Sequence, residues 1–173
     1  MALLLGGLAT PPVMASVTIP PAYVAAAEAY RIPPEVLFAV ALAESEILLT
    51  SRGRRPWPWT LNVEGREERY RTRIEAYEAI QAHLAAGRRS IDIGLMQVNW
   101  HWHGELLQDP WLALDPHFNL RAGARILRDL HLEDGDWLIS VGRYHAPART
   151  PAAQARAERY RQRVIERLEQ LWP

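Results

Sequence analysis

Two glutamates stand inside one of the most apolar stretches of the chain, Val40-Ala-Leu-Ala-Glu-Ser-Glu-Ile-Leu48. An ionised carboxylate is costly to bury, and burial raises a carboxyl pKa, which keeps the group protonated near neutral pH as a general acid requires. On a helical wheel, Glu44 and Glu46 both have apolar neighbours. The alternative interpretation is a glutamate at the edge of the core, or one paired with Arg52 or Arg54. Periodicity alone therefore does not choose between the two carboxyls.

A second candidate segment is Gly94-Leu-Met-Gln-Val-Asn99, which combines a glycine with apolar and amide side chains and has no clear period. Amides hydrogen-bond to uncharged polar ligands such as sugars, so the segment suits a binding groove. The alternative is a loop that packs Leu95 and Val98 into the core. Asp92, just before this segment, is the candidate for a second working carboxylate, although a loop-capping role is favoured for it.

Aromatic, histidine and arginine side chains give weaker signals. Tryptophan rings in irregular segments can stack on sugar faces, but core packing or loop anchoring is favoured for at least half of this set: Trp57, Trp59, Trp100 and Trp102. A His-X-His pair, His101 and His103, lacks a His-Glu-X-X-His motif, so no metal site is expected. Arginines alternate with glutamates over residues 156–169, which is typical of a solvated helix face.

Helix-start signals show which elements must position these residues. Proline pairs open helices expected over residues 20–30 and 33–50, because proline suits the first helical turn. A capping box, Thr72-Arg-Ile-Glu75, predicts a helix that ends near Gly87.

Three further helices are expected over residues 115–135, from Asp136, and from Thr150 to the end of the chain. Residues 51–69 and 90–103 show no period and are interpreted as two long loops. The expected fold class is all-α, a single helical domain whose irregular loops leave room for a minor β-hairpin.

Composition bounds the class of protein. The chain has 173 residues, of which 49% are hydrophobic and 23% charged, as in one globular domain. Its formal net charge of zero gives no indication of nucleic-acid binding, and it has no cysteine for disulfides or thiolate metal sites.

Residues 1–15 are apolar and end in Val13-Met14-Ala15, which predicts a secretory signal peptide without its usual basic start. A plain disordered N-terminus is the alternative. The domain is then 16–173, and no segment is long enough to span a bilayer.

Four motifs occur in an order that resembles a known family. They are Ala43-Glu44-Ser45, then Gly94–Asn99, then Asn119-Leu120-X-X-Gly123, then Tyr144. Together they resemble the lytic transglycosylases of the soluble-transglycosylase (SLT) catalytic-domain family, and the similarity covers roughly residues 20–160. The resemblance implies a lysozyme-like helical fold.

The resemblance also implies roles for individual residues. Glu44 is then the catalytic acid, and Glu46 is structural. The substrate-binding set implied is Ser45, Met96, Gln97, Asn119 and Tyr144. The family commonly has Tyr-Asn where this chain has Tyr144-His145, so no role carries over to His145.

The implied reaction cleaves the β-1,4 bond between MurNAc and GlcNAc in peptidoglycan without water. One glutamate protonates the leaving oxygen, the N-acetyl group stabilises an oxocarbenium-like centre, and the muramic acid 6-hydroxyl closes a 1,6-anhydro ring. One carboxyl suffices, whereas hydrolysis becomes possible if Asp92 reaches the groove. Two alternatives stay open, a hydrolytic muramidase on the same fold and a non-catalytic peptidoglycan-binding assembly factor.

Two further segments, residues 56–65 and 75–94, resemble members encoded with conjugative elements and type IV secretion or pilus systems. This implies a secreted protein of the periplasm or cell envelope that opens the wall locally for such a complex. We expect a monomer that binds peptidoglycan glycan strands, with no cofactor, no metal, no nucleic acid and no integral membrane span.

Overall fold

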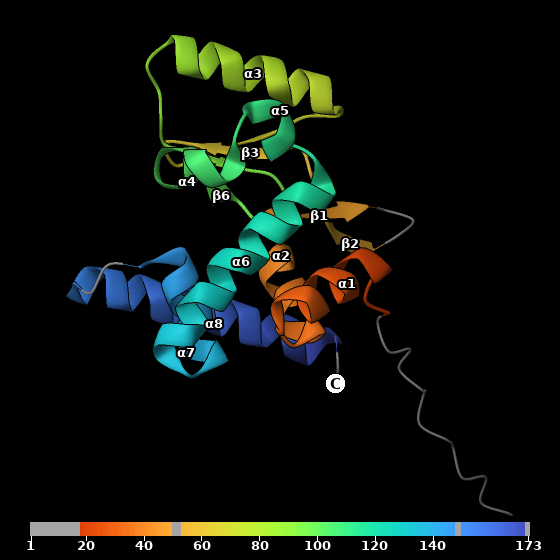
Figure 1. The fold of residues 1–173 in the computed structure, drawn as a ribbon, viewed down its shortest axis with the longest axis vertical. Helices are drawn as coiled ribbons and strands as arrows, with labels where there is room; N and C mark the ends of the chain where they lie inside the picture. Colours follow the sequence, from red (N-terminus) through yellow and green to blue (C-terminus); the bar gives the residue numbers. More distant parts are fainter. Residues whose placement is uncertain (1–17, 50–52, 148–149, 172–173) are drawn as a thin grey trace, which may run out of the picture.

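The computed structural model describes residues 18–49, 53–147 and 150–171. Within these residues there are eight helices and six short strands (Figure 1). The signal peptide expected for residues 1–15 lies outside the described part of the chain.

The first helices begin where the sequence predicts. Helices α1 (Pro21–Tyr30) and α2 (Pro34–Ser45) both carry proline in the first turn, and α3 (Arg73–Ala85) opens with the expected capping box. In this box the Thr72 hydroxyl accepts a hydrogen bond from the Glu75 backbone, and the Glu75 carboxylate accepts one from the Thr72 backbone at 3.2 Å.

Helices α6 (Pro116–Asp134), α7 (Trp137–His145) and α8 (Pro151–Leu171) also confirm the predicted starts. Aspartates cap the first two, because Asp115 accepts from the backbone of the third helical residue and Asp136 from that of the second and third. Two helices were not expected from the sequence, α4 (Trp100–Leu107) and the single-turn α5 (Pro110–Ala113).

The expectation of an all-α fold with a minor β-hairpin is confirmed in part, because the fold is mostly helical but its strands form two antiparallel sheets. Helix α2 ends at Ser45, and the residues predicted to continue it form β1 (Glu46–Leu49), which pairs antiparallel with β2 (Gly53–Pro56). A separate four-stranded antiparallel sheet occupies the two segments interpreted as loops. Its strands in spatial order are β4 (Arg66–Arg69), β3 (Thr60–Val63), β5 (Ile91–Ile93) and β6 (Val98–Asn99). Strands of two to four residues are too short to show alternation in the sequence.

Helix α2 lies at the centre of the helical part. It packs against α1, α8 and β2, and Leu37, Val40 and Ala41 are completely buried. Figure 1 shows α3, α4 and α5 gathered near the four-stranded sheet at one end, the α1, α2, α7 and α8 helices at the other, and α6 running between them. A helix buried on several sides has no polar face, and Glu46 lies beyond the end of α2, which is why helical periodicity did not rank Glu44 against Glu46.

No helix among the described residues is both long enough and apolar enough to cross a membrane.

Candidate active site

The site is organised around the turn formed by residues 94–97, between β5 and β6. Gly94 has φ +81°, and a Cβ there would lie 2.6 Å from the side chain of Asn119. The buried amide of Asn119 donates from Nδ2 to the carbonyls of Ile93 (2.8 Å) and Ala113 (3.0 Å). Its Oδ1 accepts from the Met96 backbone at 2.9 Å. One amide on α6 therefore fixes the turn, and glycine leaves the space for it.

Two other helices are tied to the same turn. Ser45, the last residue of α2, donates its hydroxyl to the Leu95 carbonyl at 2.8 Å. Tyr144 of α7 donates its hydroxyl to the Met96 carbonyl at 2.7 Å. Burial raises the pKa of Tyr144 well above its ordinary value, so the hydroxyl keeps its proton as a donor. The motifs that are distant in the sequence thus converge on residues 94–97.

The remaining residues of the turn differ in exposure. Met96 is completely buried, and a Cβ on Gly123 of α6 would approach within 2.5 Å of it. Gln97 is half-buried with φ +47°, and its amide nitrogen donates to the carbonyls of Thr60 (3.0 Å) and Gly94 (2.9 Å).

The structure therefore places the side chains of Ser45, Met96 and Asn119 in the interior, and those of Gln97 and Tyr144 partly at the surface. The assignment of these five residues to substrate binding stays a prediction.

Glu44 stands one residue before the end of α2, and 12% of its side chain is exposed. Burial raises the pKa of Glu44 to about 7; the nearby Tyr160 hydroxyl and the charge of Arg163 oppose this rise, and the negative charge of Asp92 reinforces it. The imidazole Nδ1 of His145 lies 3.9 Å from the Glu44 Oε1. With its pKa raised into the neutral range, Glu44 holds its proton at a higher pH than an ordinary glutamate, as a general acid near neutral pH must.

Tyr160 of α8 is a neighbour of this carboxyl that the sequence reasoning missed. It is 1% exposed, and its hydroxyl makes no well-aligned hydrogen bond within the described part of the chain, although its interaction with Glu44 lowers that carboxyl's pKa. Long or bent hydrogen bonds are common in unliganded catalytic sites. One feature of the sequence could have indicated Tyr160. Ala153, Tyr160 and Val164 form a buried stripe of α8, and only Tyr160 in this stripe bears a polar group.

The geometry can be compared with known proteins. A family model described as the transglycosylase SLT domain matches residues 22–165. The chain belongs to this family. Comparisons with curated proteins and with solved structures gave no match. Membership supports a lytic transglycosylase that acts on peptidoglycan, with a lysozyme-like, mostly helical fold.

Glu46, the other glutamate of the apolar stretch in the SLT domain, has a different environment. Glu46 belongs to β1, where its Oε2 lies 3.1 Å from Nε of Arg167 and its Oε1 forms an ion pair with Arg54. Pairing with an arginine was the alternative considered for either glutamate, and it holds for Glu46. Arg167 was assigned to a solvated face of the last helix, but three quarters of its side chain is covered.

Asp92 braces the β5–β6 pair of the SLT domain. Its Oδ1 accepts from Nδ2 of Asn99 at 2.7 Å, and Asn99 in turn caps α4 by accepting from the backbones of His101 and Trp102. Burial raises the pKa of Asp92, and the bond from Asn99 opposes this rise. Asp92 therefore contacts its strand partner Asn99, whereas the sequence favoured a loop cap, and its charge acts on Glu44.

The tryptophans of the SLT domain divide as expected. Trp57 donates its indole N–H to the Tyr70 carbonyl at 2.7 Å and meets Trp59 edge to face, while Trp59 and Trp100 pack against the core. Trp102 is 76% exposed. Among the described residues, no three histidine, aspartate or glutamate side chains gather as metal ligands would.

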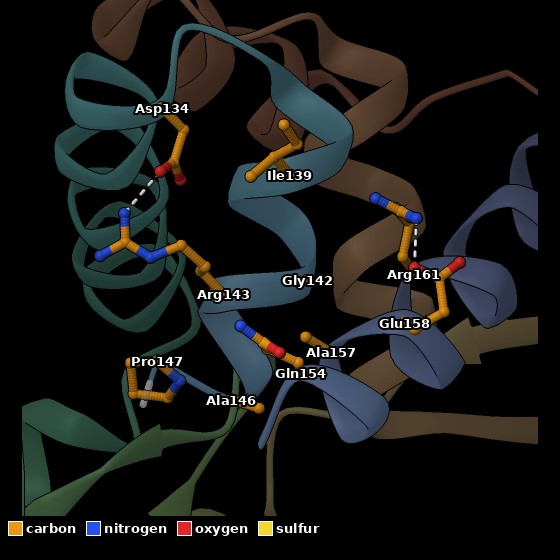
Figure 2. Close-up of a pocket in the computed structure, with 10 residues that line it drawn as sticks. All are labelled: Asp134, Ile139, Gly142, Arg143, Ala146, Pro147, Gln154, Ala157, Glu158 and Arg161. Atoms are coloured by element: carbon orange, nitrogen blue, oxygen red, sulfur yellow. Dashed lines mark hydrogen bonds and ion pairs between the residues drawn. The ribbon is translucent and has the colours of Figure 1, made fainter. Parts of the chain in front are cut away.

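A hollow of about 440 Å³ between α7 and α8 is separate from Glu44 (Figure 2). Gly142 and Arg143 line it from α7, and Figure 2 shows the Asp134–Arg143 pair on one side and the Glu158–Arg161 pair on the other. Tyr144 is not among its lining residues, because it projects from another face of the helix.

Proposed function

We propose that this domain cleaves the MurNAc–GlcNAc β-1,4 bond of peptidoglycan and forms 1,6-anhydromuramoyl ends, with Glu44 as general acid and then general base. The observation that carries the proposal is a nearly buried carboxyl with a pKa of about 7, at the end of a helix that shares its anchoring turn with Tyr144. A carboxyl with a pKa near the working pH serves both roles, since it gives up a proton and regains it with similar ease.

The reaction proceeds in two steps without water. Protonated Glu44 transfers its proton to the glycosidic oxygen as the bond to the muramic acid C1 breaks, and the GlcNAc side leaves with a hydroxyl. The N-acetyl group of the muramic acid stabilises the positive charge at C1. The 6-hydroxyl of the same sugar then attacks C1, and its proton passes to ionised Glu44. The carboxyl is returned to its starting state.

The Tyr160 hydroxyl, which is close to Glu44, suits this cycle. Tyr160 lowers the Glu44 pKa, so it stabilises the carboxylate that forms between the two steps. Gln97 uses its amide nitrogen on two backbone carbonyls, and we propose that its amide oxygen accepts from a sugar hydroxyl or amide. Ser45 and Asn119 would act on substrate binding indirectly, because their hydrogen bonds fix the backbone of residues 94–97.

Transglycosylation is favoured over hydrolysis by the environment of Asp92. A hydrolytic mechanism usually employs a second carboxylate to activate water or attack the sugar. Asp92 is engaged by Asn99 at 2.7 Å, and we assign it an electrostatic effect on Glu44 and no covalent or base role.

The test is digestion of purified sacculi followed by mass analysis of the released muropeptides. Anhydro ends, lighter by one water than reducing ends, support the proposal, and reducing ends would establish a muramidase. A protein that binds sacculi and releases nothing would be an assembly factor. Glu44→Gln should lower the rate by about 100- to 10,000-fold, the usual contribution of a general acid. Glu46→Gln, the matched control two residues away, should retain most activity, and full activity of Glu44→Gln would refute the assignment.

The resemblance of residues 56–65 and 75–94 to members encoded with conjugative elements supports a role in local wall opening for a conjugative or type IV secretion complex. Residues 1–15 would then direct the 16–173 domain to the periplasm. Loss of DNA transfer on deletion of the gene, restored by the wild-type protein and not by Glu44→Gln, is the expected result. Mass measurement of the periplasmic protein tests removal of residues 1–15.

A further inference from the structure

His145 occupies the position at which this chain departs from the family's usual Tyr-Asn pair. Its Nδ1 lies 3.9 Å from the Glu44 Oε1, which is within ion-pair distance and longer than a hydrogen bond. Its ring stacks on Tyr160 with centroids 4.5 Å apart and planes 2° from parallel. The His145 side chain is 39% exposed. A titratable ring thus stacks on Tyr160 beside Glu44 and remains open to protons from solvent.

We propose that His145 is a positioning residue that controls the Glu44 carboxyl by charge, so that the site works with a neutral imidazole and is switched off when the imidazole is protonated. The proposal rests on the proposed function, because it assigns the acidic limit of that same reaction.

The charges around His145 favour the neutral ring. From α8, the Tyr160 ring covers one face and Arg163 lies over the same tyrosine at 5.1 Å. Burial lowers the pKa of His145, and the positive charges of Arg163 and Arg156 lower it further. From α2, Glu44 faces the imidazole, and its ionised form acts in the opposite direction to the arginines.

Groups on the other neighbouring elements act indirectly or are paired. Asp92 of β5 acts on Glu44 by its negative charge. From α6, which also packs against α7, Glu133 and Asp134 both bind Arg143. Tyr144, adjacent in the chain, keeps its proton because its pKa is raised.

Protonation of His145 has two effects in the same direction. A positive charge at this distance stabilises the carboxylate and lowers a carboxyl pKa by about 1 to 3 units, which removes the proton that Glu44 must donate. The same charge repels the oxocarbenium-like centre that forms beside it. The active state therefore has protonated Glu44 and neutral His145. On the acidic side it is lost as His145 gains a proton, at its lowered pKa. On the basic side it is lost as Glu44 gives up its proton, at a pKa of about 7. An amide at position 145 has no such acidic limit.

The first test is the pH profile of the initial rate of muropeptide release from sacculi, measured for the wild type, His145→Asn and His145→Gln. The shape of each profile is compared, so a change in overall rate does not affect the result. We expect the acidic limb to move to lower pH by about one unit or more in both variants. The basic limb near pH 7 should stay in place. An acidic limb that is unchanged in both active variants overturns the proposal.

The second test does not depend on activity. The imidazole of His145 is titrated by NMR in the wild type and in Glu44→Gln, and its signal is identified by its loss in His145→Gln. A carboxylate raises the pKa of a neighbouring histidine, so the His145 midpoint should fall when Glu44 becomes glutamine. Equal midpoints overturn the coupling. If the wild type releases no muropeptides, the proposed function fails, and this titration still decides whether the pair is coupled.

Discussion

Replacing Glu44 by glutamine should stabilise the folded protein at alkaline pH and have little effect on stability at acidic pH. Glutamine has nearly the same shape as protonated glutamic acid and never ionises. The only difference that grows with pH is the cost of the Glu44 negative charge in a site where 12% of the side chain is exposed.

The size of this effect follows from the Glu44 pKa. Folding raises it from 4.5 to about 7, so the native state holds the proton more tightly than the unfolded chain. The stability associated with this proton is complete below pH 4.5 and is lost as the pH rises through 7. A shift of 2.5 units, the difference between these two values, corresponds to about 3 kcal/mol at roughly 1.4 kcal/mol per unit.

The assay is urea unfolding of the wild type and Glu44→Gln at several pH values from 4 to 8. Because titrating groups remote from the site act on both proteins alike, the difference between their unfolding free energies reports on position 44 and on its coupling to His145. It should be near zero at pH 4 and rise to about 3 kcal/mol in favour of Glu44→Gln at pH 8. Glu46→Gln is the control, and it should destabilise at pH 8 because it weakens ion pairs with Arg54 and Arg167.

A difference between wild type and Glu44→Gln that stays flat from pH 4 to 8 would refute the reasoning. It would mean that Glu44 has the same pKa in the folded and unfolded states, and that burial does not hold its proton.

Two further predictions concern the turn of residues 94–97. Gly123→Ala should destabilise the fold by about 1 to 3 kcal/mol, because its Cβ would lie 2.5 Å from Met96, whereas Gly104→Ala, with no neighbour closer than 3.9 Å, should be neutral or slightly stabilising. Urea unfolding measures both, and equal effects would contradict the packing argument. Tyr144→Phe removes the 2.7 Å bond to the Met96 carbonyl and should cost about 1 kcal/mol of stability and lower the rate of muropeptide release. Wild-type values in both assays would show that this bond does not anchor the turn.

Local signals in the sequence determined where most helices begin. Proline in the first turn, the Thr72–Glu75 capping box and the caps at Asp115 and Asp136 act within three or four residues, so tertiary packing had little to change. Strand pairing joins residues that are distant in the chain. The sheet that brings Leu61 beside Ile93 therefore left no readable pattern in either segment.

The candidate site divides in the same way. The ordered motifs singled out Glu44 and the residues of the 94–97 turn from the sequence, because they are short stretches with distinctive residues. The roles of Tyr160 and His145 became visible only in the folded chain, since α8 packs against α2 and places Tyr160 near the Glu44 carboxyl, while the end of α7 places His145 beside it.

The sequence VALAESEIL by itself determined that two carboxyls stand among apolar residues, and helix geometry did not rank them. Tertiary structure decided their environments. Helix α2 ends at Ser45, and Glu44 is therefore buried near Tyr160 with a raised pKa. Glu46 begins strand β1 instead, where it pairs with Arg54 and Arg167. The physical reason is that the state of a carboxyl depends on the solvent and charges around it, and part of that surrounding comes from α8, more than a hundred residues away.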